Sequence, residues 1–296
     1  DHRFKNNYIA TVDMSYNKDI NAVHVQDWGL KKPTSSLTGA DNRAIYGDTN
    51  HGVWTDYGFP VSSHAYVLTN SKKGSAFNAS VKIQKTFDSG LFASVAYNYM
   101  NSLDVNSIEA EITGDAFAFN PALGNVNDDV LSNSKYGDKN RFIGVASKKW
   151  KYANDKWATT VSTFFEYAQG GRFSYTYGGD INNDGSGGND LIFIPTTAQI
   201  SGMTFSGSGQ GAAYDNYIKQ DDYLNGRRGQ YAERYGALSP WRGKWDFKFM
   251  QDYNFKVSSA SNKTNTIQFS IDVLNLGNLL NSDWGLVQVP TSVQPI

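Results

Sequence analysis

The sequence predicts an all-β protein, an antiparallel β-barrel that crosses a membrane with its strands. Three observations lead to this fold class. Apolar and polar residues alternate with a period of two along segments of about 10 to 12 residues, a length that suits a tilted strand in the membrane core. No stretch of the 296 residues approaches the roughly 20 apolar residues of a membrane-spanning helix. Short turns also alternate with long polar loops, as in outer-membrane barrels, whose turns are periplasmic and whose loops are extracellular.

The clearest alternation begins at Trp157. One face of this strand would carry Trp157, Thr159, Val161, Thr163, Phe165 and Tyr167, and the other face Ala158, Thr160, Ser162, Phe164, Glu166 and Ala168. We expect the strand to continue to Tyr177 and to enter an acidic, glycine-rich loop. The remaining strands are predicted at residues 6–16, 20–28, 76–87, 91–99, 141–150, 244–255 and 266–275.

The connections between these strands alternate in length. Short turns are predicted near residues 18, 89, 154 and 260, and long loops near residues 45, 120 and 210, with a short helix around residues 214–223. On this pattern the strands that begin at residues 20, 91, 157 and 266 run toward the long loops. The apolar row ends in aromatic residues, as an interfacial girdle would: Tyr97, Tyr99, Phe165, Tyr167 and Trp245. A soluble all-β protein with one wet face is the alternative, and its apolar rows would need a partner sheet.

Composition excludes several function classes. The net charge of −1 gives no reason to expect nucleic acid as a partner, and the absence of cysteine excludes disulfides and cysteine-ligated metals. The chain contains no G-x-S-x-G, no phosphate-binding glycine loop and no H-E-x-x-H. Its four histidines are scattered: His2, His24, His51 and His64. We therefore expect no enzyme activity, although a Ser-His-Asp site assembled in space is the alternative.

One loop has the pattern of a calcium site. Asp180, Asn182, Asp184, Gly185 and Ser186 read D-x-N-x-D-G-S, the first half of an EF-hand loop, which supplies the oxygen ligands that Ca²⁺ prefers. The bidentate Glu expected at position 12 is replaced by Leu191, and Asp190 precedes it as a substitute. The candidate metal ligands are Asp180, Asn182, Asp184, Ser186 and Asp190. An Asx-rich turn without metal is the alternative, because Asn, Asp and Gly favour turns.

Six segments resemble a known family in order and spacing. They are residues 17–23 (NKDINAV), 67–74 (VLTNSKKG), 84–87 with Gly90 (QKTF), 179–195 (GDINNDGSGGNDLIFIP), 239–245 (SPWRGKW) and 273–285 (VLNLGNLLNSDWG). Together they resemble the C-terminal part of a TonB-dependent outer-membrane receptor of the Oar-like type, which often carries a carboxypeptidase-regulatory-like domain. The resemblance covers nearly the whole chain.

The resemblance implies a barrel of 22 strands, gated by an N-terminal plug and energised through TonB for uptake of a nutrient that it does not specify. We count about eight strands and the start of a ninth. An open sheet would leave unpaired edges in lipid. Residues 1–296 are therefore expected to be the C-terminal part of one barrel domain, without its plug or its final strand. A complete barrel of about ten strands is the alternative.

The family also implies a location and partners. The location is the outer membrane of a Gram-negative bacterium. The partners are outer-membrane lipid and lipopolysaccharide, the receptor's own plug and TonB, and a surface lipoprotein or larger outer-membrane complex. Two other functions stay open: a non-transporting barrel that is a structural subunit of a larger assembly, and a barrel protease or lipase.

Two sets of charges complete the candidate residues. The first is expected on the polar strand faces, toward a plug or water: Asp13, Lys82, Glu166, Asp246, Lys248 and Asp272. The second is a basic cluster in the third loop that would suit an anionic ligand or lipopolysaccharide, or be solvated only: Arg227, Arg228, Arg234 and Arg242.

Overall fold

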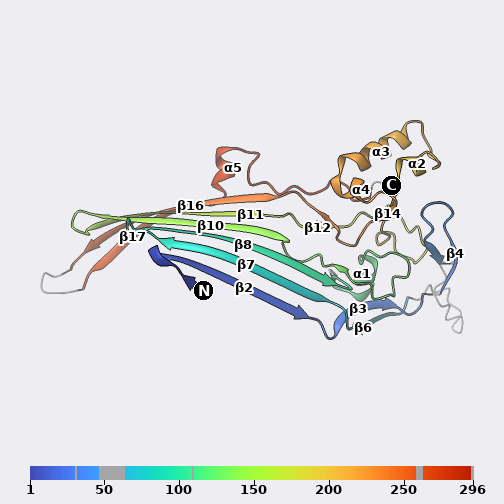
Figure 1. The fold of residues 1–296 in the computed structure, drawn as a ribbon, viewed down its shortest axis with the longest axis horizontal. Helices are drawn as coiled ribbons and strands as arrows, with labels where there is room; N and C mark the ends of the chain where they lie inside the picture. Colours follow the sequence, from blue (N-terminus) through green and yellow to red (C-terminus); the bar gives the residue numbers. More distant parts are fainter. Residues whose placement is uncertain (31, 47–63, 109, 258–262, 295–296) are drawn as a thin grey trace.

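A long antiparallel sheet dominates the computed structural model, which describes residues 1–30, 32–46, 64–108, 110–257 and 263–294. In these residues its long strands are β2 (Tyr8–Lys18), β7 (Ser75–Thr86), β8 (Leu91–Asp104), β10 (Asn140–Tyr152), β11 (Trp157–Ala168), β16 (Arg242–Phe255) and β17 (Asn265–Val273). They pair in that order. The short β1 (His2–Arg3) lies beside β2, and β9 (Ser132–Asn133) lies beside the end of β8. Figure 1 shows the strands running side by side along the molecule.

The pairing register keeps like side chains on one face. Val81 of β7 lies opposite Val12 of β2 and Tyr97 of β8. The next residue, Ser80, lies opposite polar residues on both neighbours, Asp13 and Asn98. Because successive side chains of a strand point to opposite faces, the sheet has one apolar face and one polar face. The predicted alternation is confirmed.

The hairpins of this sheet are staggered. β10 pairs with β8 only as far as Lys148, and its remaining residues to Tyr152 pair with β11 alone. β16 likewise continues past its last pair with β11, at Tyr253, and pairs with β17 through Phe255. Each hairpin therefore extends beyond the preceding one, which is the stagger of strongly tilted strands. In the part of the chain that is described, the sheet is open and its path runs from β1 to β17.

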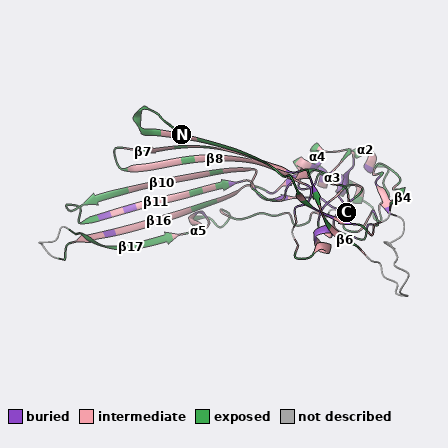
Figure 2. Cartoon of the chain, turned by 90° about the horizontal axis from the view of Figure 1, so that it is seen from below, coloured by how far each residue is buried: buried purple, intermediate pink, exposed green. Residues whose placement is uncertain are grey.

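The two ends of the sheet differ. Short connections at residues 87–90 and 153–156 lie at one end, where β16 ends and β17 begins, while the predicted turn near residue 260 lies in residues 258–262, outside the described residues. The described residues of the long connections, within 19–74, 105–139 and 169–241, lie at the other end. The long connections contain four small sheets: β3 (Ala22–Asp27) with β6 (Tyr66–Ser71), β4 (Pro33–Ser36) with β5 (Ala44–Tyr46), β12 (Arg172–Phe173) with β15 (Ala237–Leu238), and β13 (Phe193–Ile194) with β14 (Gln230–Tyr231). Figure 2 shows these elements gathered beyond one end of the strands.

Helices and the apolar core also lie mainly at this long-loop end. The loops contain α1 (Thr113–Ala118), α2 (Thr197–Ile200), α3 (Gln210–Gln220) and α4 (Asp222–Gly226), and α5 (Leu276–Leu280) follows β17. α3 and α4 agree with the helix predicted around residues 214–223. Ile192, Ile194, Ile218 and Leu224 are fully buried in one cluster beneath them. None of the described helices has the length and apolar character needed to span a membrane.

The structure corrects the predicted first hairpin. Residues 20–28 are not the return strand of β2, because they form β3, which pairs with β6, whereas β2 pairs with β7. The segment 17–19 is therefore not a tight turn, and β2 runs toward the long loops instead of away from them. The Asp19 N–H donates to the carbonyl oxygen of Gly74 at 3.1 Å. Pairing with the distant strand has therefore prevailed over the local turn preference of Asn and Asp.

The strand that begins at Trp157 is shorter than predicted. β11 ends at Ala168 and not at Tyr177. A Cβ at Gly170 would lie 2.4 Å from the carbonyl oxygen of Pro240, so the chain packs there against the segment that leads into β16. This close approach ends the regular ladder and turns the chain into the third loop.

Candidate functional site

The apolar face of the sheet is bounded by two rows of aromatic side chains. The row at the short-turn end comprises Tyr8, Phe87, Trp150, Tyr152, Trp157, Tyr253 and Phe255. The row at the long-loop end comprises Tyr16, Phe77, Tyr97, Tyr99, Phe142, Phe165, Tyr167, Trp241 and Trp245. Neighbouring rings touch within each row: the centroids of Trp157 and Tyr253 are 4.6 Å apart, and those of Tyr167 and Trp241 are 4.8 Å apart.

Most side chains between these rows are aliphatic or aromatic, with Thr159, Thr163 and Gln251 among the polar exceptions, and many of the apolar ones are exposed. Val81, Ile83 and Val95 are 45%, 52% and 62% exposed. Soluble proteins rarely leave so large a continuous apolar surface uncovered. This face therefore requires an apolar environment or a partner.

The polar face carries ion pairs between strands, and one of them, Lys149–Asp252, reaches across β11 from β10 to β16. Arg141 lies 2.9 Å from Glu166, Lys149 lies 2.8 Å from Asp252, and Lys248 lies 3.0 Å from Asp272. Within β16, Lys244 lies 3.1 Å from Asp246. The strand registers place all the charges predicted for the polar face there: Asp13, Lys82, Glu166, Asp246, Lys248 and Asp272.

The predicted calcium loop folds around the buried carboxylate of Asp184. Asp184 Oδ1 accepts from Ser186 N–H at 2.9 Å, and Oδ2 accepts from the side-chain amides of Asn182 and Asn189 at 3.1 and 3.0 Å. Asp180 accepts from the backbone N–H groups of Asp184 and Gly185 at 3.0 and 2.8 Å. These bonds stabilise a tight loop, in which the structure brings Asp180, Asn182, Asp184 and Ser186 together.

Asp190, the fifth predicted ligand, is turned toward protein groups. Its Oδ1 lies 3.0 Å from Arg43 Nη1, and its Oδ2 accepts from the N–H of Ile181 at 3.1 Å. Among the described residues no three His, Cys, Asp or Glu side chains are arranged as a metal site. Asn189 Oδ1 is nevertheless buried and accepts no hydrogen bond from any described residue. Calcium binding in this loop stays a prediction.

Burial changes the acidity of the loop. Burial, with repulsion from Asp180, raises the pKa of the Asp184 carboxyl. Burial first, and repulsion from Asp184 second, raise the pKa of Asp190 to about 7, although Arg43 opposes the shift. Ionising the Asp184 and Asp190 carboxyls inside the buried loop therefore costs free energy, and a bound cation would reduce that cost.

Arg43 joins the first long loop to the third. Its Nε donates to Asp41, Nη1 contacts Asp190, and Nη2 donates to the carbonyl oxygen of Leu191 at 2.5 Å. The guanidinium carbon lies 4.7 and 5.6 Å from the ring centroids of Tyr177 and Tyr231. Burial lowers the pKa of Arg43, but the hydrogen bond and the charges of Asp41 and Asp190 raise it above its ordinary value.

Arg234 joins the third loop to the second. Its Nη1 donates to the carbonyl oxygen of Val105 at 2.7 Å, and its Nη2 donates to the backbone carbonyls of Asp104 and Val130. Burial lowers the pKa of this guanidinium. The two buried arginines therefore tie the three long loops into one packed unit.

The predicted basic cluster does not gather into one site. Each of its arginines has its own carboxylate: Arg227 with Glu233 at 3.1 Å, Arg228 with Asp215 at 2.9 Å, Arg234 with Asp104 at 3.3 Å and Arg242 with Asp138 at 2.9 Å. Their charges are therefore compensated within the loops, which argues against a concentrated anion site.

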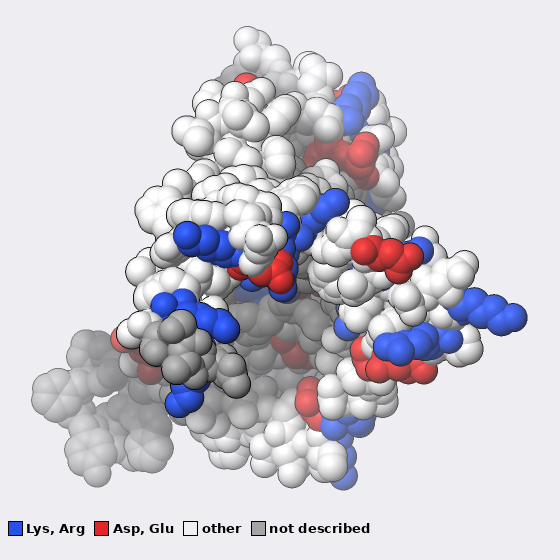
Figure 3. All heavy atoms as spheres, turned by 90° about the vertical axis from the view of Figure 1, so that its left-hand side faces the viewer, with Lys and Arg blue, Asp and Glu red and all other residues white. Residues whose placement is uncertain are grey.

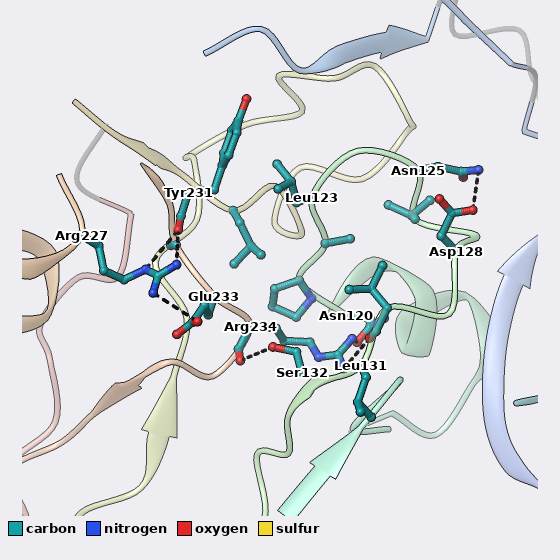
Figure 4. Close-up of a pocket in the computed structure, with 16 residues that line it drawn as sticks. Asn120, Leu123, Asn125, Asp128, Leu131, Ser132, Arg227, Tyr231, Glu233 and Arg234 are labelled. Atoms are coloured by element: carbon teal, nitrogen blue, oxygen red, sulfur yellow. Dashed lines mark hydrogen bonds and ion pairs between the residues drawn. The ribbon is translucent and has the colours of Figure 1, made fainter. Parts of the chain in front are cut away.

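A cavity of about 390 Å³ opens between the second and third loops (Figure 4). Leu123, Leu131 and Tyr231 give it apolar walls, and the Arg227–Glu233 pair and Asp128 add polar groups. This size and mixed lining suit a small ligand with apolar and polar parts.

The histidines have structural contacts. His24 is buried, with Nε2 3.0 Å from the carbonyl oxygen of Asn127. His64 Nδ1 lies 2.7 Å from Asp27 Oδ2, while Asp27 Oδ1 accepts from the N–H of Ala65. His2 is exposed at the start of the chain, and His51 lies outside the described residues. The absence of catalysis stays a prediction.

No family model, curated protein or solved structure matches this chain. The resemblance to TonB-dependent receptors therefore has only the sequence segments behind it.

Two groups of residues escaped the sequence reasoning. Nothing local marks Arg43 as buried, since its main partner Asp190 is distant in sequence. Lys85 and Lys148, in contrast, stand in the apolar rows of β7 and β10. A lysine at an apolar position of the alternation, next to an aromatic residue, could have been predicted from the sequence to lie at the polar boundary of the apolar face.

Proposed function

We propose that this chain forms part of the wall and outer loops of an outer-membrane β-barrel of the TonB-dependent receptor type, which takes up a nutrient. The apolar face meets lipid, the polar face lines the lumen or contacts a plug, and the packed loops face the exterior. The complete barrel has 22 strands on this proposal. The chain supplies binding and passage and performs no chemical step.

The distance between the two aromatic rows is the observation that carries this proposal. Trp157 and Tyr167 belong to opposite rows and lie ten positions apart on β11. At about 3.3 Å per residue they are roughly 33 Å apart along the strand. A tilt of about 45° converts this to a height of roughly 23 Å, close to the ~25 Å apolar band of outer-membrane barrels.

The long-loop end supports a role in ligand capture. In such barrels the long loops face the exterior. Here two buried arginines hold the three loops together, and the cavity between Leu123 and Tyr231 lies between the second and the third. A preformed cavity costs less ordering on binding than separate mobile loops. We assign the first contact with substrate to this cavity.

Adjacent positions on one strand test the placement in the membrane. A nitroxide spin label at Val95 of β8 would point to lipid and one at Ser94 to the polar face. In the intact gene product, reconstituted into phosphatidylcholine vesicles, we expect the Val95 label to collide more with oxygen and the Ser94 label more with a water-soluble nickel complex. Equal accessibility at the two positions would refute a lipid-facing sheet.

Transport needs a separate test. Strains lacking this gene and strains lacking TonB are compared across a panel of limiting nutrients. A shared growth defect on one nutrient supports TonB-dependent uptake. An outer-membrane assembly defect without a shared nutritional defect would favour the alternative, a barrel that acts as a structural subunit.

A further inference from the structure

Two lysines interrupt the apolar face. Lys85 of β7 lies opposite Tyr8 of β2, and Lys148 of β10 lies opposite Val161 of β11, so both side chains share the face of these apolar partners. A charge on a lipid-facing surface is costly unless its head reaches the interface. The position of these lysines along the strands therefore decides what they contact.

Both lysines lie at the short-turn end, among the aromatic rings. Lys85 Nζ is 4.1 Å from the ring centroid of Tyr8 and 4.7 Å from that of Phe87. Lys148 Nζ is 5.4 Å from the ring of Trp150. Long lysine side chains cover apolar surface with their methylene groups while the ammonium stays at the polar boundary.

A third lysine, on the same hairpin as Lys148, continues this row. Lys156, in the turn between β10 and β11, has its Nζ 5.5 Å from the ring centroid of Tyr253. Because the hairpins are staggered, these lysines follow the tilted line on which the strands end. We call Lys85, Lys148 and Lys156 with their rings the lysine belt.

The belt is short of negative charge. Two neighbouring carboxylates are engaged by other lysines: Asp155 lies 3.8 Å from Lys151, and Asp252 lies 2.8 Å from Lys149 on the opposite face. Asp88, in the turn next to Phe87, is the remaining acid beside the belt. Within the described residues none of the three belt lysines has an ion pair. Figure 3 views this end of the molecule and shows Lys and Arg side chains projecting around its edge, with Asp and Glu side chains beside several of them. An uncompensated row of cations next to an apolar band matches an anionic headgroup attached to acyl chains.

We infer that the lysine belt binds the phosphate headgroups of anionic phospholipids at the membrane boundary nearest the short turns. The ammonium groups contact the phosphates, the rings lie at the level of the glycerol backbone, and the acyl chains cover Val81, Val161 and their neighbours. This inference rests on the proposed membrane placement of the sheet. It adds a preference for lipid charge, which an apolar face alone does not have.

Spin-labelled lipids test the belt and its premise together. The intact gene product is reconstituted into phosphatidylcholine vesicles with a trace of spin-labelled phosphatidylglycerol or phosphatidylcholine, and the motionally restricted fraction is measured. Each lysine near a membrane surface attracts an anionic lipid by about 1 kcal/mol. The restricted fraction averages the lipids at the belt with all the other lipids around the protein, so we expect roughly threefold selectivity for phosphatidylglycerol. The variant K85M/K148M/K156M should lose it. The control K32M/K72M/K139M, with the same charge change at the long-loop end, should keep it.

The outcomes separate the two proposals. The lysine belt is overturned if wild type and the belt variant show equal selectivity for phosphatidylglycerol, or if wild type shows none. In either case the membrane placement still stands, provided that a motionally restricted lipid population is observed. No restricted population for either lipid overturns the placement itself. Since none of the belt lysines has an ion pair with a described residue, the melting temperature of the belt variant in detergent should equal that of the control, and a lower value would show instead that their ring contacts are structural.

Discussion

Replacing Arg43 with Met should release the first long loop from the third. The Arg43 side chain is 1% exposed, and so is that of its partner Asp190. Methionine keeps the length and the apolar stem but removes the contacts to Asp41, Asp190 and the carbonyl oxygen of Leu191. The Asp190 carboxylate is then buried without its cation, which is the costly part of the change.

The size of the effect follows from that burial. Leaving one partner of a buried ion pair uncompensated costs about 3–5 kcal/mol. At about 1.4 kcal/mol per factor of ten, backbone amides that the contact protects should exchange roughly 10²- to 4 × 10³-fold faster. The N–H of Tyr46, which donates to the carbonyl oxygen of Asn182 at 2.8 Å, reports on this contact between loops.

The effect should also depend on pH. Burial and the charge of Asp184 raise the pKa of Asp190 to about 7 even with Arg43 present. The stability contributed by an acid with a raised folded-state pKa is complete below its unfolded pKa, about 4, and is lost as the pH rises through 7. In Arg43→Met the carboxyl can be neutralised by a proton, so the defect should be larger at pH 8 than at pH 5.5.

Hydrogen exchange followed by mass spectrometry in the intact gene product measures the release of the first loop, the size of the effect at Tyr46 and its dependence on pH. Arg43→Met combined with Asp190→Asn should recover most of the lost protection, because the buried charge is gone. Arg3→Met, the same change at an exposed site at the other end, is the matched control. Unchanged exchange at Tyr46 in Arg43→Met, or a double variant no better than the single one, would refute the role of Arg43 as the contact that joins the loops.

Three further predictions concern the sheet and the loops. Val81→Arg, between the aromatic residues Phe77 and Phe87 on the apolar face of β7, should lower the free energy of unfolding in vesicles by about 2–4 kcal/mol, whereas Ser80→Arg on the polar face should change it little; equal losses in urea titrations would contradict the assignment of faces. Arg234→Met should increase proteolysis of the third loop by trypsin with little change in the strands, since its buried contacts are to loop carbonyls. Calcium at millimolar concentration should protect residues 180–190 from exchange, more at pH 8 than at pH 6 because Asp190 must lose its proton, and Asp184→Asn should abolish the protection; no difference between calcium and EGTA would leave the loop an Asx-rich turn.

Local pattern was enough for most of the sheet. The strands near residues 76, 91, 141, 157, 244 and 266 and the residues on each face followed from alternation, because the side-chain period of a strand is fixed at two. The turns at residues 87–90 and 153–156 followed from the turn-forming residues between the strands. Alternation could not decide which strands pair. The first hairpin was wrong for this reason: an Asn-Lys-Asp segment has the composition of a turn, but β2 pairs with β7 across the whole first loop.

The candidate site, too, was predictable only where its contacts are local in sequence. The D-x-N-x-D-G spacing identified a loop that does fold around Asp184, because the hydrogen bonds involved join residues at most five positions apart. It did not reveal that Asp190 is paired with Arg43, since 147 positions separate them. The charges of Arg227, Arg228 and Arg242 suggested a cluster in sequence, whereas in space each has a separate acid.

The sequence by itself determined that this protein is built from long two-faced strands with short turns at one end and long loops at the other. That information is local, since it depends on side-chain alternation and on the residues that favour turns. Only the tertiary structure decided how the loops pack. Their core and their buried arginines, Arg43 and Arg234, depend on contacts between loops that are far apart in sequence. It also decided that Lys85, Lys148 and Lys156 form one row, because the stagger of the hairpins, and not the strand pattern, sets their relative height.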